Sequence, residues 1–266
     1  VVMLHVGSAI GLLAYFWRDW VEIVTAFFRT LPKRRVETST ERLAWLIVVA
    51  TIPAGILGLV LEHPLRTLFA KPLAAAIFLM VNGVVLATAE VYRRRDEVRQ
   101  LAIRAGAVPD GEAGTEREEH PEGAWRAAFE VTAPAAPHRR LDTLDYREAG
   151  VIGVAQSTAL LAGISREGVC MGAGLARGLD HSDSARFAFL LATPIIVAAG
   201  LFKLPDLLGP HGNGIRGQAA AAAVAAAIAA YFTVRFLVGY FKTKTLSPFA
   251  AYCVLFGLAM VVYTQT

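Results

Sequence analysis

The sequence has few of the residues that build disulfide frameworks or metal centres. It contains only two cysteines, Cys170 and Cys253, and both lie in apolar segments, which argues against a fold held together by disulfides. Its six histidines are scattered and form no metal-ligand spacing. The Gly-rich phosphate loop and the G-x-S-x-G turn of serine hydrolases are also absent. The sequence therefore does not indicate a disulfide-rich protein, a histidine metal centre, a phosphate-loop nucleotide-binding protein or a serine hydrolase.

The chain also lacks a basic patch interleaved with aromatic residues. Its formal net charge of +4 therefore does not indicate a nucleic-acid-binding protein, and no nucleic-acid partner is expected. A signal peptide is not predicted, because the sequence starts at Val1 directly in apolar residues, without a basic n-region or a small-residue cleavage site. We expect this start to be the interior of a longer protein.

The main feature of the sequence is a series of long stretches without charge. About 20 apolar residues cross the ~30 Å core of a bilayer as a helix. Buried helices of a large soluble protein are the alternative, but soluble helices show a polar stripe that these stretches lack. The sequence therefore predicts an all-α integral membrane protein with six membrane helices. They are expected within 1–17, 44–61, 72–89, 187–202, 217–234 and 245–266.

A further apolar region, at 148–178, is interrupted by the adjacent polar residues Ser165, Arg166 and Glu167. Two helices of about 14 residues with a break at "AGIS" would each be ~21 Å long, too short to cross the membrane. A re-entrant hairpin solves this problem, because both helices then begin and end on the same side of the membrane. Irregular backbone at that depth is tolerated only where it is buried in protein or lines a cavity.

The charges of the connecting segments support the hairpin. With a hairpin at 148–178, the expected loops at 18–42, 93–147, 178–186 and 235–244 lie on one side, which then holds most of the lysines and arginines. The excess of basic residues makes that side cytoplasmic. The hairpin tip then reaches the midplane from inside and points toward the outer face.

The hairpin tip has the composition of an anion-binding site. Ser165 is the expected N-cap of the second half-helix, whose first N–H groups have no partner within the helix. Arg166 adds a positive charge and a planar fork of donors that suits phosphate, and Gly163 and Gly168 allow close approach of the backbone. A helix dipole and free N–H groups favour an anion at this position.

The same residues also allow purely structural interpretations, or interpretations without a bound anion. Ser165 alone could be an ordinary helix cap, and Arg166 could extend its side chain toward the membrane surface. Glu167 could simply pair with Arg166. Gln156, on the first half-helix, could hydrogen-bond between helices or contact a substrate, and we include it among the candidate substrate-binding residues.

At these residues the sequence resembles the undecaprenyl-diphosphate phosphatase family, the bacitracin-resistance type of membrane enzyme. The family's second signature, roughly P-G-x-S-R-S-G-x-T, stands here as "AGISREGVC". The stretches "MLHVGSAIGLLAYFWRDW", "DYREAGVIGVAQ" and "SARFAFLLATPIIVAAG" also resemble their family counterparts. The resemblance covers essentially the whole chain, in order.

The resemblance implies a fold of two inverted repeats, each with a re-entrant hairpin. The single membrane domain, 1–266, would then comprise the remainder of the first repeat (1–92), a polar cytoplasmic loop (93–147) and the second repeat (148–266). It also implies hydrolysis of undecaprenyl diphosphate to the monophosphate with Mg²⁺ or Ca²⁺, in the bacterial plasma membrane with the active site facing outward. This reaction recycles the lipid carrier of cell-wall synthesis and confers bacitracin resistance.

The resemblance assigns roles residue by residue. Ser165 and Arg166 match the Ser-Arg of the signature, for diphosphate binding and catalysis, and Gly163 and Gly168 match its glycines. Glu167 and Cys170 replace its second serine and its threonine and are candidate substrate contacts, and Glu167 is a candidate cation ligand. Ala162 replaces the proline.

The family's first signature, with its glutamates and its Ser-Ser-Thr-Gly-His run, would lie upstream of Val1. The chain is therefore expected to carry one of two re-entrant hairpins and half of the active site. Two other functions fit the same residues: a polyprenyl-phosphate flippase or transporter, and a lipid-diphosphate-binding relative without catalysis. The oligomeric state is not predicted.

Overall fold

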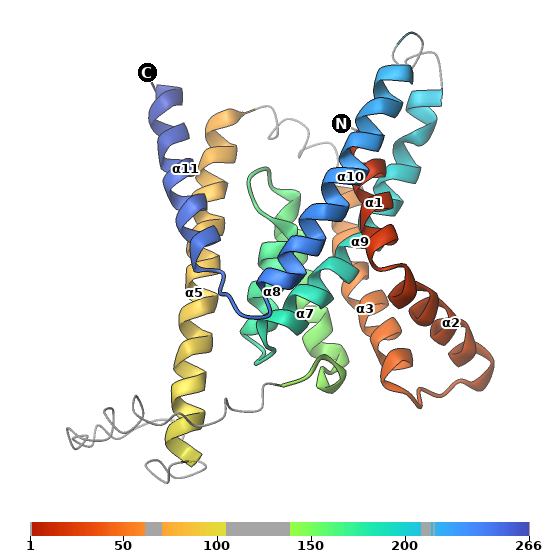
Figure 1. Cartoon of the computed structure of the whole chain (residues 1–266), viewed down its shortest axis with the longest axis vertical. Helices are drawn as coiled ribbons and strands as arrows, with labels where there is room; N and C mark the ends of the chain where they lie inside the picture. Colours follow the sequence, from red (N-terminus) through yellow and green to blue (C-terminus); the bar gives the residue numbers. More distant parts are fainter. Residues whose placement is uncertain (1, 62–70, 105–138, 209–213, 215, 266) are drawn as a thin grey trace.

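The computed structural model of the chain describes residues 2–61, 71–104, 139–208, 214 and 216–265. Every regular element in these ranges is helical, with one isolated bridge between Arg139 and Leu179. The predicted all-α class is therefore confirmed. The helices, drawn in Figure 1, are α1 (Val2–Tyr15), α2 (Trp17–Lys33), α3 (Ser39–Val60), α5 (Pro72–Arg104), η1 (Leu141–Thr143), α7 (Tyr146–Ser157), η2 (Thr158–Leu160), α8 (Arg166–Leu175), α9 (His181–Leu208), α10 (Arg216–Tyr240) and α11 (Ser247–Gln265).

Five helices within the described ranges are long and apolar enough to cross a membrane. They are α3, α5, α9, α10 and α11, which correspond to five of the six predicted stretches. The sixth stretch, 1–17, forms α1, an apolar helix that is shorter than the other five in the described residues. The protein is thus a multi-pass membrane protein.

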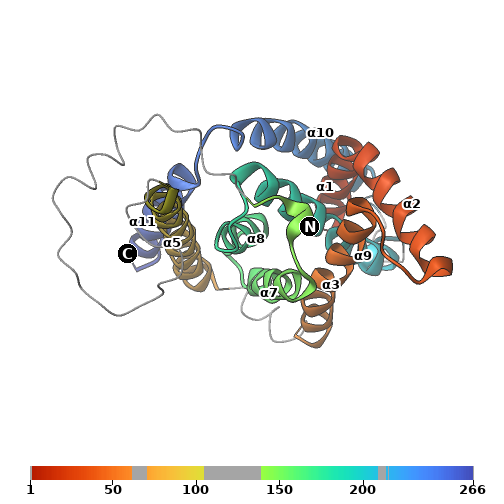
Figure 2. The same cartoon turned by 90° about the horizontal axis from the view of Figure 1, so that it is seen from below.

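The membrane helices form two groups with the short helices α7 and α8 between them (Figures 1 and 2). In one group α5 packs along α11, and in the other α1 packs along α10 and α9. The helix α10 contains the alanine-rich run that begins at Ala220, and close helix packing is the role that such a run predicts in a membrane.

Two segments that were expected to be loops are helical in part. The segment 18–42 contains most of α2, because one side of this amphipathic helix buries Ile23, Ala26 and Thr30. The hydroxyl of Thr30 accepts a hydrogen bond from the Trp45 indole at 3.0 Å, which ties α2 to α3.

The expected loop at 93–147 begins as helix, because α5 continues to Arg104. Ion pairs one helical turn apart, Arg94 with Glu90 and Arg93 with Glu97, support this polar extension. Residues 105–138 of the expected loop lie outside the described residues.

The hairpin predicted at 148–178 is present as α7, η2 and α8, spanning 146–175. Asp145 begins α7 with a capping box, in which its side chain accepts from the Glu148 N–H and the Glu148 carboxylate accepts from the Asp145 N–H. The chain direction then reverses between η2 and α8, so α7 begins and α8 ends at the same end of the molecule (Figure 1).

Close backbone contacts seat the hairpin between two membrane helices. On α7, a Cβ atom added to Gly153 would lie 2.3 Å from the Ala50 carbonyl oxygen of α3, so only glycine allows this approach. Further along, Leu160 reaches Gly58 of α3, so the first half of the hairpin follows α3. The second half, α8, packs against α9 and α5.

The α3–α7 contact can be tested with two alanine substitutions on one helix. Gly153→Ala forces the backbones apart and should destabilise the fold by about 1–3 kcal/mol, seen as a lower thermal midpoint of the purified protein. Gly150→Ala, one turn earlier, meets nothing within 4 Å and should leave stability unchanged or slightly raised. Equal midpoints for the two variants would contradict the close contact.

Candidate anion-binding site at the hairpin tip

The capping of α8 is as predicted. Ser165 has extended backbone angles, and its Oγ accepts a hydrogen bond from the Gly168 N–H at 3.1 Å. The Val169 N–H is bonded to the Ser165 carbonyl, as in a regular first turn. This leaves the N–H groups of Arg166 and Glu167 as the donors of the first turn without an acceptor in the helix.

The turn before α8 depends on Gly163. Its φ is +100°, a value that side chains with a Cβ rarely adopt, and an added Cβ would lie 2.2 Å from the Ala75 carbonyl oxygen of α5. The tip therefore presses its backbone against the first two turns of α5.

A residue that the sequence interpretation missed holds this tip. Asn82 of α5 is fully buried, and its Oδ1 accepts the Ser165 N–H at 3.2 Å. Its Nδ2 donates to the Cys253 sulfur of α11 at 3.4 Å. A lone asparagine in the apolar stretch 72–89 was the available signal, because polar groups at that depth need a partner. Asn82 lies near the middle of this stretch, so Ser165 lies at mid-depth too.

Arg166 and Glu167 do not pair with each other. Among the described residues neither side chain forms an ion pair or a hydrogen bond, and both are partly exposed beside Ser165. Two neighbouring residues on a helix point in different directions, which explains why they do not meet. The tip therefore presents a guanidinium and a carboxylate that are available to a ligand.

Cys170 and Gln156 lie deeper, at the contact between α8 and α7. Both are buried, and the thiol donates to the Gln156 Oε1 at 3.5 Å. The Gln156 Nε2 is buried without a hydrogen-bond partner in the described residues. These two residues join the hairpin halves, and Gln156 retains one unused donor.

The donor set at the tip fits a cation only in part. In the described ranges no group of three or more His, Cys, Asp or Glu side chains converges. Among the described residues of the tip, Glu167 is the one that carries a carboxylate. Mg²⁺ is commonly held by one or two carboxylates together with phosphates of a ligand and water, so a single carboxylate beside a bound anion is compatible with it.

The base of the hairpin is fixed by a second charged contact. Arg139, which precedes α7, binds both carboxylate oxygens of Glu148, with an Nη2–Oε2 distance of 2.7 Å. The hydrogen bond from Arg139 holds the pKa of Glu148 below its ordinary value. Arg139 also donates to the Arg177 carbonyl, so it connects the two ends of the hairpin.

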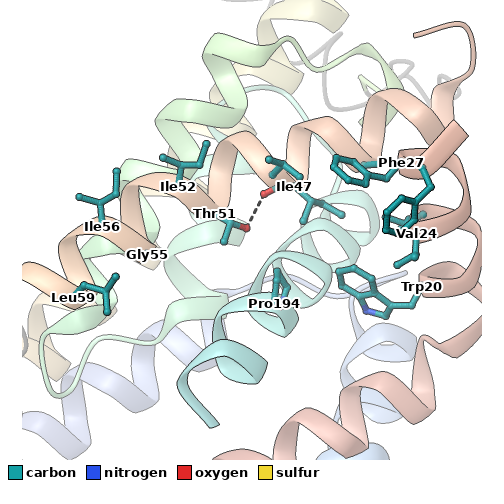
Figure 3. Close-up of a pocket in the computed structure, with 14 residues that line it drawn as sticks. Trp20, Val24, Phe27, Ile47, Thr51, Ile52, Gly55, Ile56, Leu59 and Pro194 are labelled. Carbon is teal, nitrogen blue, oxygen red and sulfur yellow. Dashed lines mark hydrogen bonds between the residues drawn. The ribbon is translucent and has the colours of Figure 1, made fainter. Parts of the chain in front are cut away.

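An apolar groove of about 530 Å³ lies outside this site, between α2 and α3 (Figure 3). Phe27, Thr51, Ile56 and Pro194 are among its lining residues. The α3 residue that contacts α7, Ala50, is not among them. The groove therefore opens on another face of α3 and does not belong to the hairpin site.

The fold and the tip together define a class: a multi-pass helical membrane protein in which a short inserted hairpin presents a capped helix N-terminus and an unpaired arginine. The comparisons with known proteins show the family. The model of the bacitracin resistance protein BacA family matches residues 1–259, and the chain belongs to this family.

Individual relatives are similar over nearly the whole chain. Undecaprenyl-diphosphatase 2 of Frankia alni is 55% identical over 97% of this chain and 79% of its own length. The undecaprenyl-diphosphatase of Mycolicibacterium paratuberculosis is 50% identical over 99% of this chain and 80% of its own length. A more distant relative, undecaprenyl-diphosphatase 2 of Chromobacterium violaceum, is 37% identical over 99% of the chain and 82% of its own length.

The role of Asn82 can be tested by hydrogen exchange. Asn82→Leu removes the acceptor of the Ser165 N–H, a partly buried hydrogen bond, and this should destabilise the tip by about 1–3 kcal/mol. We expect faster amide exchange in peptides covering 161–170, with exchange in α10 unchanged. Thr88→Val serves as the control, because this exposed hydroxyl bonds only within α5. Unchanged exchange at the tip of Asn82→Leu would contradict the anchoring role.

The Arg139–Glu148 contact predicts a pH dependence. Because the pKa of folded Glu148 is lowered, its stabilisation is present above the ordinary glutamate pKa and disappears as pH falls through the lowered value. Glu148→Gln should therefore lower the thermal midpoint at pH 7, and the difference from wild type should shrink below about pH 4. A difference independent of pH would show that the carboxylate charge does not matter.

Proposed function

We propose that this protein hydrolyses undecaprenyl diphosphate to undecaprenyl phosphate and inorganic phosphate in the bacterial plasma membrane. The observation that carries the proposal is the hairpin tip, where the free first turn of α8 and the unpaired Arg166 meet at mid-depth. Membership of the BacA family and the names of the similar relatives support the same reaction.

The tip offers three kinds of donor to a diphosphate. The N–H groups of Arg166 and Glu167 point along the helix axis, where the helix dipole favours an anion. The Ser165 hydroxyl already accepts from Gly168, so its own proton is left to donate to a phosphate oxygen. The Arg166 guanidinium can bind two oxygens at once. These groups hold the terminal phosphate while water cleaves the P–O–P bond and undecaprenyl phosphate leaves.

Glu167 needs a different role, because a carboxylate beside a diphosphate repels it. We propose that Glu167 and the phosphate oxygens hold a divalent cation, Mg²⁺ or Ca²⁺, between them. When bound, such a cation neutralises charge that develops on the phosphate oxygens. Glu167 replaces a hydroxyl residue of the family signature, so this role is specific to chains that carry the carboxylate.

The charge distribution supports an outward-facing site. The base of the hairpin carries Arg139 and Arg177, and the polar end of α5 nearby carries Arg93 and Arg95. Basic residues favour the cytoplasmic side. The tip, at the far end of the hairpin, then opens toward the outer side, and we propose that the prenyl chain stays in the bilayer.

Phosphate release by the purified protein tests the function. The full-length protein with Mg²⁺ should release phosphate from undecaprenyl diphosphate, and a chelator should stop the release. Arg166→Ala removes a bidentate donor from the reacting phosphate and should lower kcat/KM by about 100-fold or more. Arg147→Ala, which removes an exposed arginine at the base of the hairpin, should leave kcat/KM unchanged.

The possible outcomes separate the parts of the proposal. No release by the full-length protein with either cation would reject the enzyme and favour a binding protein or a transporter. Release that survives in Arg166→Ala would reject the assigned site but not the activity. A Glu167→Gln variant that needs no more Mg²⁺ than wild type would reject the cation role alone.

A further inference from the structure

A second concave site lies at the opposite end of the hairpin from Ser165. It is a cavity of about 670 Å³ between the polar end of α5 and the segment that follows α8. Four arginines line it: Arg93, Arg95 and Arg99 from α5, and Arg177 from the hairpin. Figure 2, seen from this end of the molecule, shows α5 beside α8. The arginines thus converge from segments about 80 residues apart in sequence.

Within the described residues, neither Arg95 nor Arg177 of this cavity pairs with an acidic side chain. Glu148 also lines it, but its carboxylate is bound by Arg139 and by the Asp145 N–H. Arg93 pairs with Glu97 through Nη2 at 2.8 Å, and its Nε is buried without a hydrogen-bond partner in the described residues. Like charges held close together repel, and a bound anion removes this cost.

Membrane topology alone does not account for this arrangement. Exposed lysines and arginines anywhere in a short loop satisfy the positive-inside preference. By sequence alone, the run Arg93–Arg95 beside a membrane helix is interpreted as such a topology signal. Of this run, Arg94 turns to Glu90, whereas Arg93 and Arg95 line the cavity. Arg177, from a different segment, lines the same cavity. The positive-inside preference does not require arginines of two segments to line one cavity large enough for a ligand.

The position of the cavity indicates the kind of anion. The apolar part of α5 ends at about Val91, so the arginines that follow it lie at the depth of lipid headgroups. Guanidinium groups match phosphate oxygens in pairs, and basic pockets between membrane helices bind anionic headgroups. We propose that this arginine cavity binds a phosphate group, carried by an anionic membrane lipid or present as free phosphate, separately from the Ser165 site.

The test measures binding to the full chain in the Arg166→Ala background, so that the hairpin tip contributes little. The probes are dioctanoyl phosphatidic acid, dioctanoyl phosphatidylcholine and inorganic phosphate, with calorimetry or native mass spectrometry as the readout. Phosphatidic acid should bind and the zwitterionic lipid should not. Arg177→Gln and Arg95→Gln should each weaken phosphatidic acid binding about tenfold, the loss of one charge-assisted contact.

Matched controls remove the same charge from the same end of the protein. Arg147→Gln and Arg140→Gln alter exposed arginines that do not line the cavity, and they should leave the affinity unchanged. Equal losses in the control and cavity variants, or equal binding of the zwitterionic lipid, would overturn the proposal. An unchanged thermal midpoint of Arg177→Gln excludes misfolding as the cause of weaker binding.

Competition distinguishes the two sources of phosphate. If inorganic phosphate displaces phosphatidic acid and binds with the same arginine dependence, then the phosphate group alone is the ligand. If it does not, while the arginine dependence of phosphatidic acid remains, then the ligand is the lipid headgroup together with its chains. Since the Ser165 site is already impaired in this background, neither result depends on whether the protein hydrolyses undecaprenyl diphosphate.

Discussion

The central constraint on this protein is that a helix is broken inside an apolar layer. Backbone groups exposed by such a break have no water to bind and must find partners in the protein. Here the break is closed locally by the hydrogen bonds from Leu161 N–H to the Thr158 carbonyl and from Ile164 N–H to the Leu161 carbonyl. The Ser165 N–H, which lies beyond reach of these turns, goes to Asn82 of another helix. The hairpin therefore depends on α5 for its local geometry.

The same set of hydrogen bonds defines the site. Once Ser165 has capped Gly168 and Asn82 has bound Ser165, the donors left over are those that begin α8, together with the Arg166 side chain. A conformation that satisfied these donors internally would have no capacity for an anion. The proposed diphosphate thus accepts hydrogen bonds from donors that have no acceptor within the fold. At this depth water competes poorly for the same donors.

The sequence predicted features that depend on local pattern. Charge-free stretches indicated the membrane helices, and the polar break in "AGISREGVC" indicated the hairpin and the cap at Ser165. The roles of Asn82, the convergence of Arg177 with the α5 arginines and the burial of Gln156 could not be predicted, because each depends on which distant segments become neighbours. The helix α2 was not predicted for a related reason: its apolar side is stabilised by packing against α3, a distant contact that the sequence pattern does not show. The repeat organisation, the cation and the substrate roles of individual residues stay predictions.

The shortness of the hairpin has a consequence for how the protein is made. Neither α7 nor α8 is long enough to cross a bilayer, and the Ser165 N–H at the tip is bound by Asn82 of α5. Such a segment cannot be inserted as an independent unit. It must settle after α3 and α5 are in place to receive it, with Gly153 against Ala50 and Ser165 against Asn82. Assembly of the site is therefore a late step in biogenesis. Substitutions that slow helix docking should reduce the yield of correctly folded protein without changing the activity of the molecules that do fold.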